Sequence, residues 1–164
     1  MSSPVQIRSA TAADVPLILS LIRELAEYEK LGHEAVADEA ALRATLFGER
    51  PYAETLIAEL DGAPAGFALF FHNYSTFLGK PGIYLEDLFV RPSARRHGVG
   101  KALLQRVAQL ALQRNCGRFE WSVLDWNEPA LRFYQSLGAV AKKEWIIHRV
   151  SGEALQRLAQ GADN

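Results

Sequence analysis

Residues 84–104 constrain the fold of this chain more than any other stretch, because a strand, a basic turn and a helix follow one another directly. Strand-forming residues fill most of positions 84–90, and Pro92 ends the strand because proline has no N–H to give to a ladder. Gly98 and Gly100 allow a tight turn and a close approach of the backbone to a ligand. From Lys101 to Gln113, apolar residues recur at three- and four-residue spacing, which predicts a half-buried helix.

The start of this helix is a candidate anion site. Free N–H groups at a helix N-terminus, with Arg95 and Arg96 just before it, suit a phosphate or pyrophosphate. The stretch is not a P-loop, since it lacks the four-residue gap between glycines and the Gly-Lys-Ser/Thr ending. It is not a dinucleotide fingerprint either, which needs three glycines. On this stretch alone, a tight turn with solvated arginines is the alternative.

Length and composition narrow the class of protein. At 164 residues the chain can bury a full core, and we expect residues 1–164 to form a single domain. A net charge of −1 gives no general attraction to nucleic acid or membrane, so neither is expected as a partner. The only cysteine, Cys116, and the lack of an apolar signal segment favour a cytoplasmic setting.

Metal chemistry is not expected. The histidines show no metal-ligand spacing with one another or with Cys116, so each is interpreted as a surface or core residue. They are His33, His72, His97 and His148.

The order of elements predicts an α/β protein with a mixed, mostly antiparallel sheet flanked by helices. Asp61-Gly62 is a hairpin signal between two early strands, and later strands alternate with helices. The predicted strands are Val5–Arg8, Thr55–Leu60, Ala65–Tyr74, Tyr84–Val90, Gly117–Leu124 and Glu144–Val150. The predicted helices begin near residues 11, 38, 101, 128 and 151.

Two motifs together resemble the GNAT superfamily of N-acetyltransferases. The pattern Arg95-x-x-Gly98-x-Gly100 after an apolar strand is similar to that family's acetyl-CoA loop. A second segment is similar to its Asn-x-x-Ala-x-x-Phe-Tyr-x-x-x-Gly motif, and it consists of Asn127, Ala130, Phe133, Tyr134 and Gly138. The resemblance covers nearly the whole chain and implies the GNAT fold, acetyl-CoA as cosubstrate and an amine as acceptor.

The resemblance narrows to the diamine (spermidine/spermine) acetyltransferases, some of which prefer thialysine or other lysine-like amines. Five segments carry it: Ile7–Asp14, Glu24–Glu29, Tyr84–Val90, Trp126–Pro129 and Phe133–Ala139. Members of that subfamily are usually dimers, so we expect a homodimer that shares the final strand.

Acetyl transfer needs an amine that loses its proton and a thiolate that gains one. By resemblance, Tyr134 is the acid that faces the sulfur, and Glu86 is the base for the amine, through a water. The structural alternative for Tyr134 is a core aromatic, and that for Glu86 is a salt bridge to a lysine or arginine of a helix. Strict strand alternation would put Glu86 and Asp87 on opposite faces, so at most one should line a given cleft.

The resemblance also implies a cofactor site. Backbone N–H groups near Leu88, Phe89 and Val90 would stabilise the thioester oxygen and pair with the pantetheine arm. Asn127 would contact the cofactor, with an ordinary helix cap as the alternative, and Ala130 and Tyr134 would lie nearby. The pyrophosphate would be held by Arg95, Arg96, His97, Gly98, Val99, Gly100 and Lys101.

For the amine, carboxylates would pair with ammonium groups and aromatic faces would hold methylene or cationic segments. The implied residues are Tyr28, Glu29, Glu86, Glu120, Trp121, Ser122 and Trp145. Two departures from the subfamily, a leucine at position 88 and Lys142-Lys143 in a short segment before Trp145, favour shorter amines over long polyamines. The alternatives are an acetyltransferase for an aminoglycoside, amino acid or protein amine, and a non-catalytic acetyl-CoA sensor.

Overall fold

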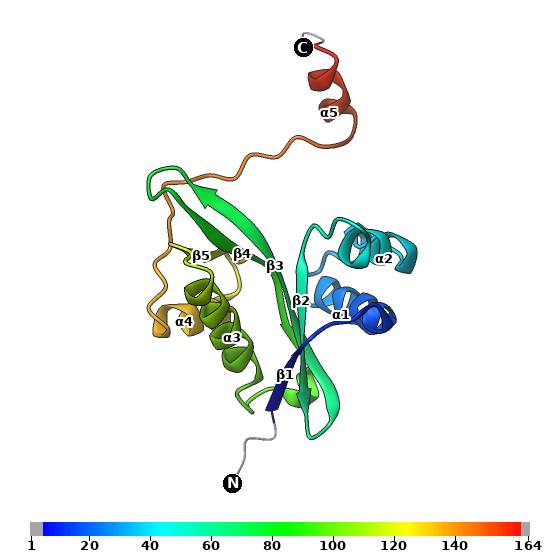
Figure 1. Cartoon of the computed structure of the whole chain (residues 1–164), viewed down its shortest axis with the longest axis vertical. Helices are drawn as coiled ribbons and strands as arrows, with labels where there is room; N and C mark the ends of the chain where they lie inside the picture. Colours follow the sequence, from blue (N-terminus) through cyan, green and yellow to red (C-terminus); the bar gives the residue numbers. More distant parts are fainter. Residues whose placement is uncertain (1–4, 162–164) are drawn as a thin grey trace. The chain divides into compact units, whose positions relative to one another are not determined.

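A five-stranded mixed sheet is the centre of the first of two units, residues 1–124, of this computed structural model, which describes residues 5–161 (Figure 1). The strands lie in the order β1-β2-β3-β4-β5, with three antiparallel pairings followed by a parallel one between β4 and β5. The predicted mixed, mostly antiparallel sheet is therefore confirmed. The strands are β1 (Val5–Ser9), β2 (Glu54–Leu60), β3 (Ala63–Ser75), β4 (Lys80–Val90) and β5 (Phe119–Trp121).

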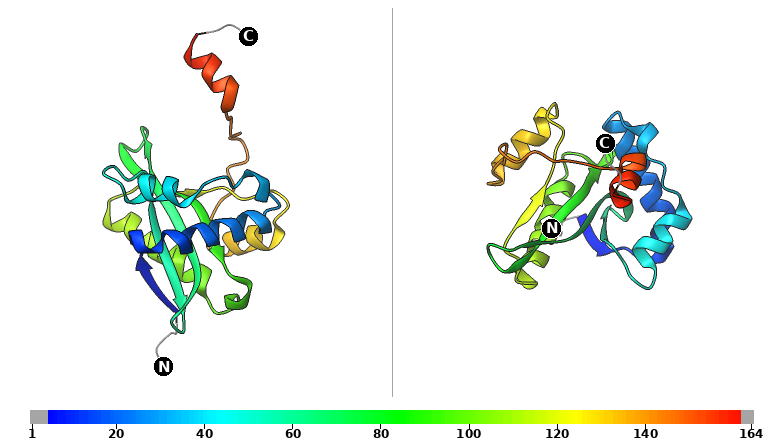
Figure 2. Two further views of the ribbon diagram at one scale, coloured as in Figure 1. Left: turned by 90° about the vertical axis from the view of Figure 1, so that its right-hand side faces the viewer. Right: turned by 90° about the horizontal axis from the view of Figure 1, so that it is seen from above.

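Helices cover both faces of this sheet. α1 (Val15–Tyr28) and α2 (Glu39–Phe47) lie on one face, and α3 (Val99–Gln113) lies on the other, as the two rotated views also show (Figure 2). The core between α1, α2 and the sheet is made of buried apolar side chains, which include Ile18, Leu21, Leu42, Ile57 and Phe67. This burial of one apolar stripe per helix fixes α1 on the sheet.

The entry into α1 is set by a network around Asp14. The Thr11 N–H donates to the Asp14 carboxylate at 2.7 Å, across the short 3₁₀ helix η1 (Ala12–Asp14). The Arg8 guanidinium on β1 binds both Asp14 oxygens at 2.8 Å and Glu59 at 2.9 Å. Pro16 lies in the first turn of α1, where its missing N–H has no helical partner to lose.

Residues 125–164 form the second unit. It contains α4 (Glu128–Ser136) and α5 (Gly152–Ala159), both close to the predicted helices. The predicted strand Glu144–Val150 is wrong, because these residues are in neither strand nor helix. A strand needs a ladder partner, and within residues 5–161 this segment pairs with no other strand. Its apolar side chains, including Trp145, Ile146 and Ile147, are largely exposed.

Within the described residues 5–161, no helix is long and apolar enough to cross a membrane.

Two further 3₁₀ helices connect the elements of the first unit, η2 (Gly32–Glu34) and η3 (Pro92–Ala94).

Candidate active site

The candidate site begins where β4 and β5 separate. Their parallel pairing covers only three positions, from Ile83–Phe119 to Leu85–Trp121. β4 continues to Val90 with β3 on one edge, and over residues 5–161 no strand pairs with its other edge beyond Leu85. The predicted oxyanion and pantetheine positions, Leu88, Phe89 and Val90, lie on this stretch of β4. Such an open strand edge can hydrogen-bond an extended ligand.

A β-bulge at Glu86 marks the point of separation. Leu85 pairs with Phe70 and Asp87 pairs with Leu69, so Glu86 is an extra residue in β4. The strict alternation expected for Glu86 and Asp87 is therefore wrong, because a bulge re-aims the side chains that follow it. The register puts Asp87 opposite Leu69, on the face of the sheet that α1 covers.

Three carboxyl groups gather at this bulge. Asp87 is half-buried, and this burial, then the charges of Glu86 and Glu29, raise its pKa to about 7. Burial also raises the pKa of Glu29 at the C-terminal end of α1. Glu86 is exposed. A carboxylate with a pKa near neutral pH is suited to exchange a proton with an amine, so this carboxylate cluster can serve as a base and as a cation site.

The family resemblance implied Glu86, and not Asp87, as the base. The available signal was two adjacent acids in an otherwise apolar strand. Residue types alone do not show a one-residue bulge, so they could not show that Asp87 turns toward α1 and Glu29.

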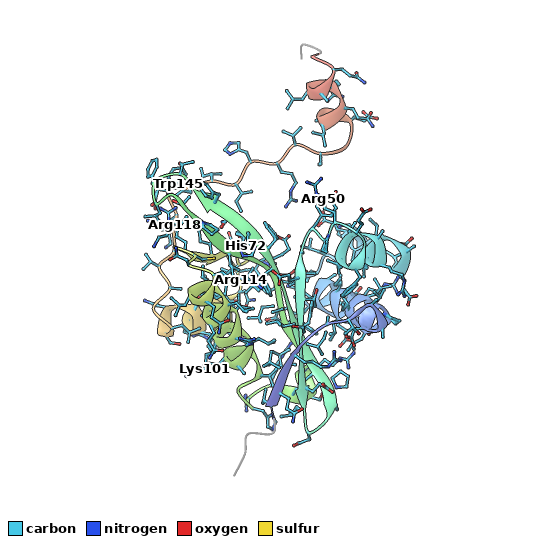
Figure 3. All side chains as sticks on the ribbon, viewed as in Figure 1. Arg50, His72, Lys101, Arg114, Arg118 and Trp145 are labelled. Atoms are coloured by element: carbon cyan, nitrogen blue, oxygen red, sulfur yellow. The ribbon has the colours of Figure 1, made fainter. Side chains whose placement is uncertain are left out.

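The predicted pyrophosphate loop follows β4. Gly98 caps α3 with φ of 78°, a left-handed conformation that favours glycine, and Arg96 also has a positive φ of 67°. A Cβ on Gly100 would meet only a Val90 methyl at 3.6 Å, so the fold itself does not require glycine there. Lys101 lies on the first turn of α3 (Figure 3). The open space at Gly100 and the free N–H groups of the first helical turn fit a pyrophosphate.

His97 and Arg95 make contacts within the loop. The Nδ1 atom of His97 lies 2.8 Å from the Arg95 carbonyl oxygen, so the ring folds back on its own backbone. The Arg95 Nε–H donates to the Val90 carbonyl at 3.2 Å, and its guanidinium lies 5.2 Å from the centre of the Tyr28 ring. Tyr28, predicted to hold the amine, is thus in contact with the predicted cofactor loop.

The predicted amine residues on and after β5 lie along its junction with β3 and β4. Glu120 accepts a hydrogen bond from Asn73 at 3.2 Å. Ser122 and Tyr84 share a hydrogen bond of 2.6 Å between their hydroxyl groups. The structure therefore brings these polar side chains together beside β4, while the ring of Trp121 packs against Phe119.

The remaining predicted residues belong to the second unit. The Asn127 side chain accepts from the Ala130 N–H at 3.4 Å and caps α4, which is the helix-cap alternative. Tyr134 lies in the last turn of α4 with its ring 5.8 Å from that of Phe133. Trp145 lies in the segment without secondary structure.

A metal site does not emerge from the described part of the chain. Among residues 5–161, no group of three or more His, Cys, Asp or Glu side chains could hold a metal ion. His72 lies beside Arg114, and the guanidinium of Arg114 forms a bidentate ion pair with the Glu54 carboxylate (Figure 3).

The fold and the match to a family model define the class of this protein as an acetyltransferase. The model of the "Acetyltransferase (GNAT) family" matches residues 19–139. A solved structure, an integron cassette protein from V. cholerae, superposes with a TM-score of 0.82 at 28% identity, covering 97% of this chain and 99% of that one.

The chain belongs to the GNAT family, and its sequence fits the diamine and thialysine branch. It is similar to a thialysine N-epsilon-acetyltransferase from Bos taurus, with 43% identity over 94% of this chain and 97% of the relative. An L-ornithine N5-acetyltransferase from Arabidopsis thaliana is 37% identical, over 93% of this chain and 87% of the relative. The predicted family is therefore confirmed.

Proposed function

We propose that this enzyme moves the acetyl group of acetyl-CoA to the terminal primary amine of a short, lysine-like amine or diamine. The observation that carries the proposal is the carboxylate cluster of Glu29, Glu86 and Asp87 at the bulge where the edge of β4 becomes open. The relatives named for thialysine and L-ornithine support an amine on a short carbon chain.

The carboxylate cluster would bind the ammonium form of the substrate and take its proton. An alkylamine has a pKa near ~10, so it arrives mostly charged and must lose a proton before it attacks. Glu86 and Asp87 are the candidate bases, and Asp87 has the pKa of about 7 that suits this task. Glu29 would neutralise a second positive charge on the substrate.

We propose direct transfer in a ternary complex. Bound acetyl-CoA supplies the thioester; a new N–C bond forms at the acetyl carbon, and the C–S bond breaks. Tyr134 would give its phenolic proton to the departing sulfur, an assignment that rests on its motif. A backbone N–H of Leu88 to Val90 would stabilise the oxygen that gains charge.

The acetyl-CoA site would be the open β4 edge together with the loop before α3. Arg95 and Arg96 supply positive charge, and the first turn of α3 supplies free N–H groups. His97, Gly98, Val99, Gly100 and Lys101 complete this loop. From the second unit, we assign Asn127, Ala130 and Tyr134 to the same ligand by their motif.

The remaining predicted residues would shape the amine pocket. Glu120 and Trp121 lie in the paired part of β5 and Ser122 follows it, while Trp145 would contribute an aromatic face. Long polyamines are disfavoured by Lys142 and Lys143, of which Lys142 pairs with Glu144 at 3.2 Å.

We also propose a homodimer in which the segment Glu144–Val150 becomes a strand against a second copy. The support is an apolar segment, including Trp145, Ile146 and Ile147, that is exposed in the single chain. Light scattering should give twice the mass of the 18.2 kDa chain, and a monomer mass would refute this part of the proposal.

The function is tested by a thiol-release assay with acetyl-CoA and a panel of thialysine, ornithine, lysine, putrescine, spermidine, spermine, an aminoglycoside and a peptide. The expected result is a kcat/KM for thialysine or ornithine at least tenfold above that for spermine. A preference for spermine or the aminoglycoside would overturn the substrate class. Binding of acetyl-CoA without turnover of any amine would favour a sensor.

A further inference from the structure

Two contacts in succession join α1 to the chain that leaves β4. The Glu24 carboxylate accepts from the Arg91 guanidinium at 2.9 Å, and the Tyr28 ring lies 5.2 Å from the Arg95 guanidinium. Glu24 and Tyr28 are four residues apart on α1, so they lie on the same face, one turn apart. Arg91 and Arg95 are likewise four residues apart and flank the 3₁₀ helix η3.

Through these two contacts, Glu24–Arg91 and Tyr28–Arg95, α1 restrains the loop before α3. The ion pair joins Glu24 of α1 to Arg91, the residue that follows β4. Arg91 is itself held against the sheet, because its backbone N–H donates to the Ala65 carbonyl of β3 at 2.8 Å. One turn further along α1, Tyr28 meets the first residue after η3. The position of the Arg95 side chain is thus set by a helix outside its own loop.

The contact also fixes which part of the Arg95 side chain is available. Its Nε–H donates to the Val90 carbonyl, and its guanidinium carbon lies over the Tyr28 ring, 5.2 Å from the ring centre. Over the described residues 5–161, the two terminal nitrogens of Arg95 make no hydrogen bond and no ion pair. A guanidinium held this way presents two parallel N–H donors, the geometry that suits a phosphate.

We propose that Tyr28 is a positioning residue for the cofactor loop: its ring holds the Arg95 guanidinium so that the terminal nitrogens meet the pyrophosphate of acetyl-CoA. This inference rests on the proposed acetyl-CoA site. It gives Tyr28 a role different from the one expected by resemblance, which was to bind the amine. Removal of the ring should therefore weaken the binding of CoA, even though Tyr28 itself is not part of the loop.

The test measures binding of CoA by calorimetry to the full chain and to four variants. Tyr28→Leu removes the ring, Tyr28→Phe keeps it, Arg95→Met removes the cation, and the double variant removes both. An exposed cation–ring contact predicts a three- to fivefold weaker CoA Kd for Tyr28→Leu, and a Kd near that of the native chain for Tyr28→Phe. The double variant should be no weaker than Arg95→Met alone, because both changes remove one interaction. Tyr52→Leu, at an exposed tyrosine of the same unit, is the matched control and should change nothing.

Steady-state kinetics distinguish a Tyr28 that positions Arg95 for CoA from a Tyr28 that binds the amine. We expect Tyr28→Leu to raise the KM for acetyl-CoA while the KM for the amine and kcat stay near their native values. A rise in the amine KM with an unchanged CoA Kd would overturn the inference and leave the proposed function standing. Failure of the native chain to bind CoA at all would overturn the proposed function, and the inference with it.

Discussion

Asp87 on β4 has a raised pKa mainly because it is partly buried, and the charges of Glu86 and then of Glu29, at the end of α1, raise it further. Glu29 and Asp87 are far apart in the sequence, and the bulge at Glu86 is what turns Asp87 toward α1. Two like charges held together in a half-buried position destabilise the fold unless a cation enters between them. We therefore propose that this pair binds the ammonium group of the substrate.

The raised pKa of Asp87 should make the free energy of unfolding depend on pH. The pKa of Asp87 in the folded state, about 7, lies above its ordinary value of 3.8, so the folded state binds the proton more tightly. The resulting penalty is absent below pH 4, grows as the pH rises, and is complete above pH 7. Asp87→Asn should therefore raise the unfolding free energy by ~2–4 kcal/mol at pH 8, the upper value being three pKa units at about 1.4 kcal/mol each before the partial exposure of Asp87 is discounted, and leave it unchanged at pH 4. Urea unfolding at the two pH values measures this, and an equal effect at both would contradict the assigned cause.

The rate of acetyl transfer should follow the same titration. We expect kcat/KM to rise with pH through an apparent pKa near 7, which belongs to the carboxylate cluster as a coupled group. In Asp87→Asn this step should move to lower pH or disappear, with a rate loss of 10²-fold or more. Glu86→Gln is the paired variant. If it removes the step near pH 7 while Asp87→Asn keeps it, Glu86 is the base.

Tyr134→Phe removes only a hydroxyl from the last turn of α4. As the proposed proton donor to the sulfur, Tyr134 should contribute to kcat and little to binding. We expect kcat to fall about 10²-fold while the CoA Kd stays within about twofold. Phe133→Leu, at the adjacent ring, is the control for packing, and its main effect should be on stability. Full turnover by Tyr134→Phe would remove the assignment.

The two glycines of the loop should respond differently to alanine. Gly98 has a φ of 78°, so Gly98→Ala should lower the unfolding free energy by about 1–2 kcal/mol. At Gly100 the new methyl group meets only a Val90 methyl at 3.6 Å, and the fold should keep its stability. The same methyl group would occupy the approach to the α3 N-terminus, so Gly100→Ala should raise the KM for acetyl-CoA at least tenfold. Thermal unfolding and saturation kinetics on the two variants separate a strained turn from a blocked ligand site.

The sequence predicted those parts of the structure that depend on local pattern. Proline and glycine placed the ends of β4 and the start of α3 within a few residues, and the apolar spacing gave α1 and α3. The loop predicted to bind the cofactor and the two adjacent acids, Glu86 and Asp87, lay within the same predicted strand–turn–helix stretch. These features depend on neighbouring residues, so they can be predicted without knowing which distant strand or helix packs against them.

The features that the sequence predicted wrongly, or did not show, depend on residues far away in the chain or outside it. The bulge at Glu86 is a difference of one residue between the β3 and β4 registers, and no residue type marks it. The apolar residues around Trp145 predicted a strand, but a strand forms only against another strand. The contact between Tyr28 and Arg95 depends on where α1 crosses the end of β4, which local periodicity does not determine.

Acid unfolding should depend on the Asp14 network at the start of α1. Hydrogen bonds from Arg8 hold the pKa of Asp14 at about 2, below its ordinary value of 3.8, against the opposing effect of burial. The stabilisation is therefore complete above pH 4 and is lost as the pH falls through 2. Asp14→Asn should lower the unfolding free energy by ~1–2 kcal/mol at pH 7, a value reduced because Arg8 is 40% exposed. The difference from the native chain should shrink toward pH 2. Glu49→Gln, at an exposed carboxylate in the α2–β2 connection, should unfold like the native chain at every pH, and a similar loss there would show that general charge, not this network, sets the acid limit.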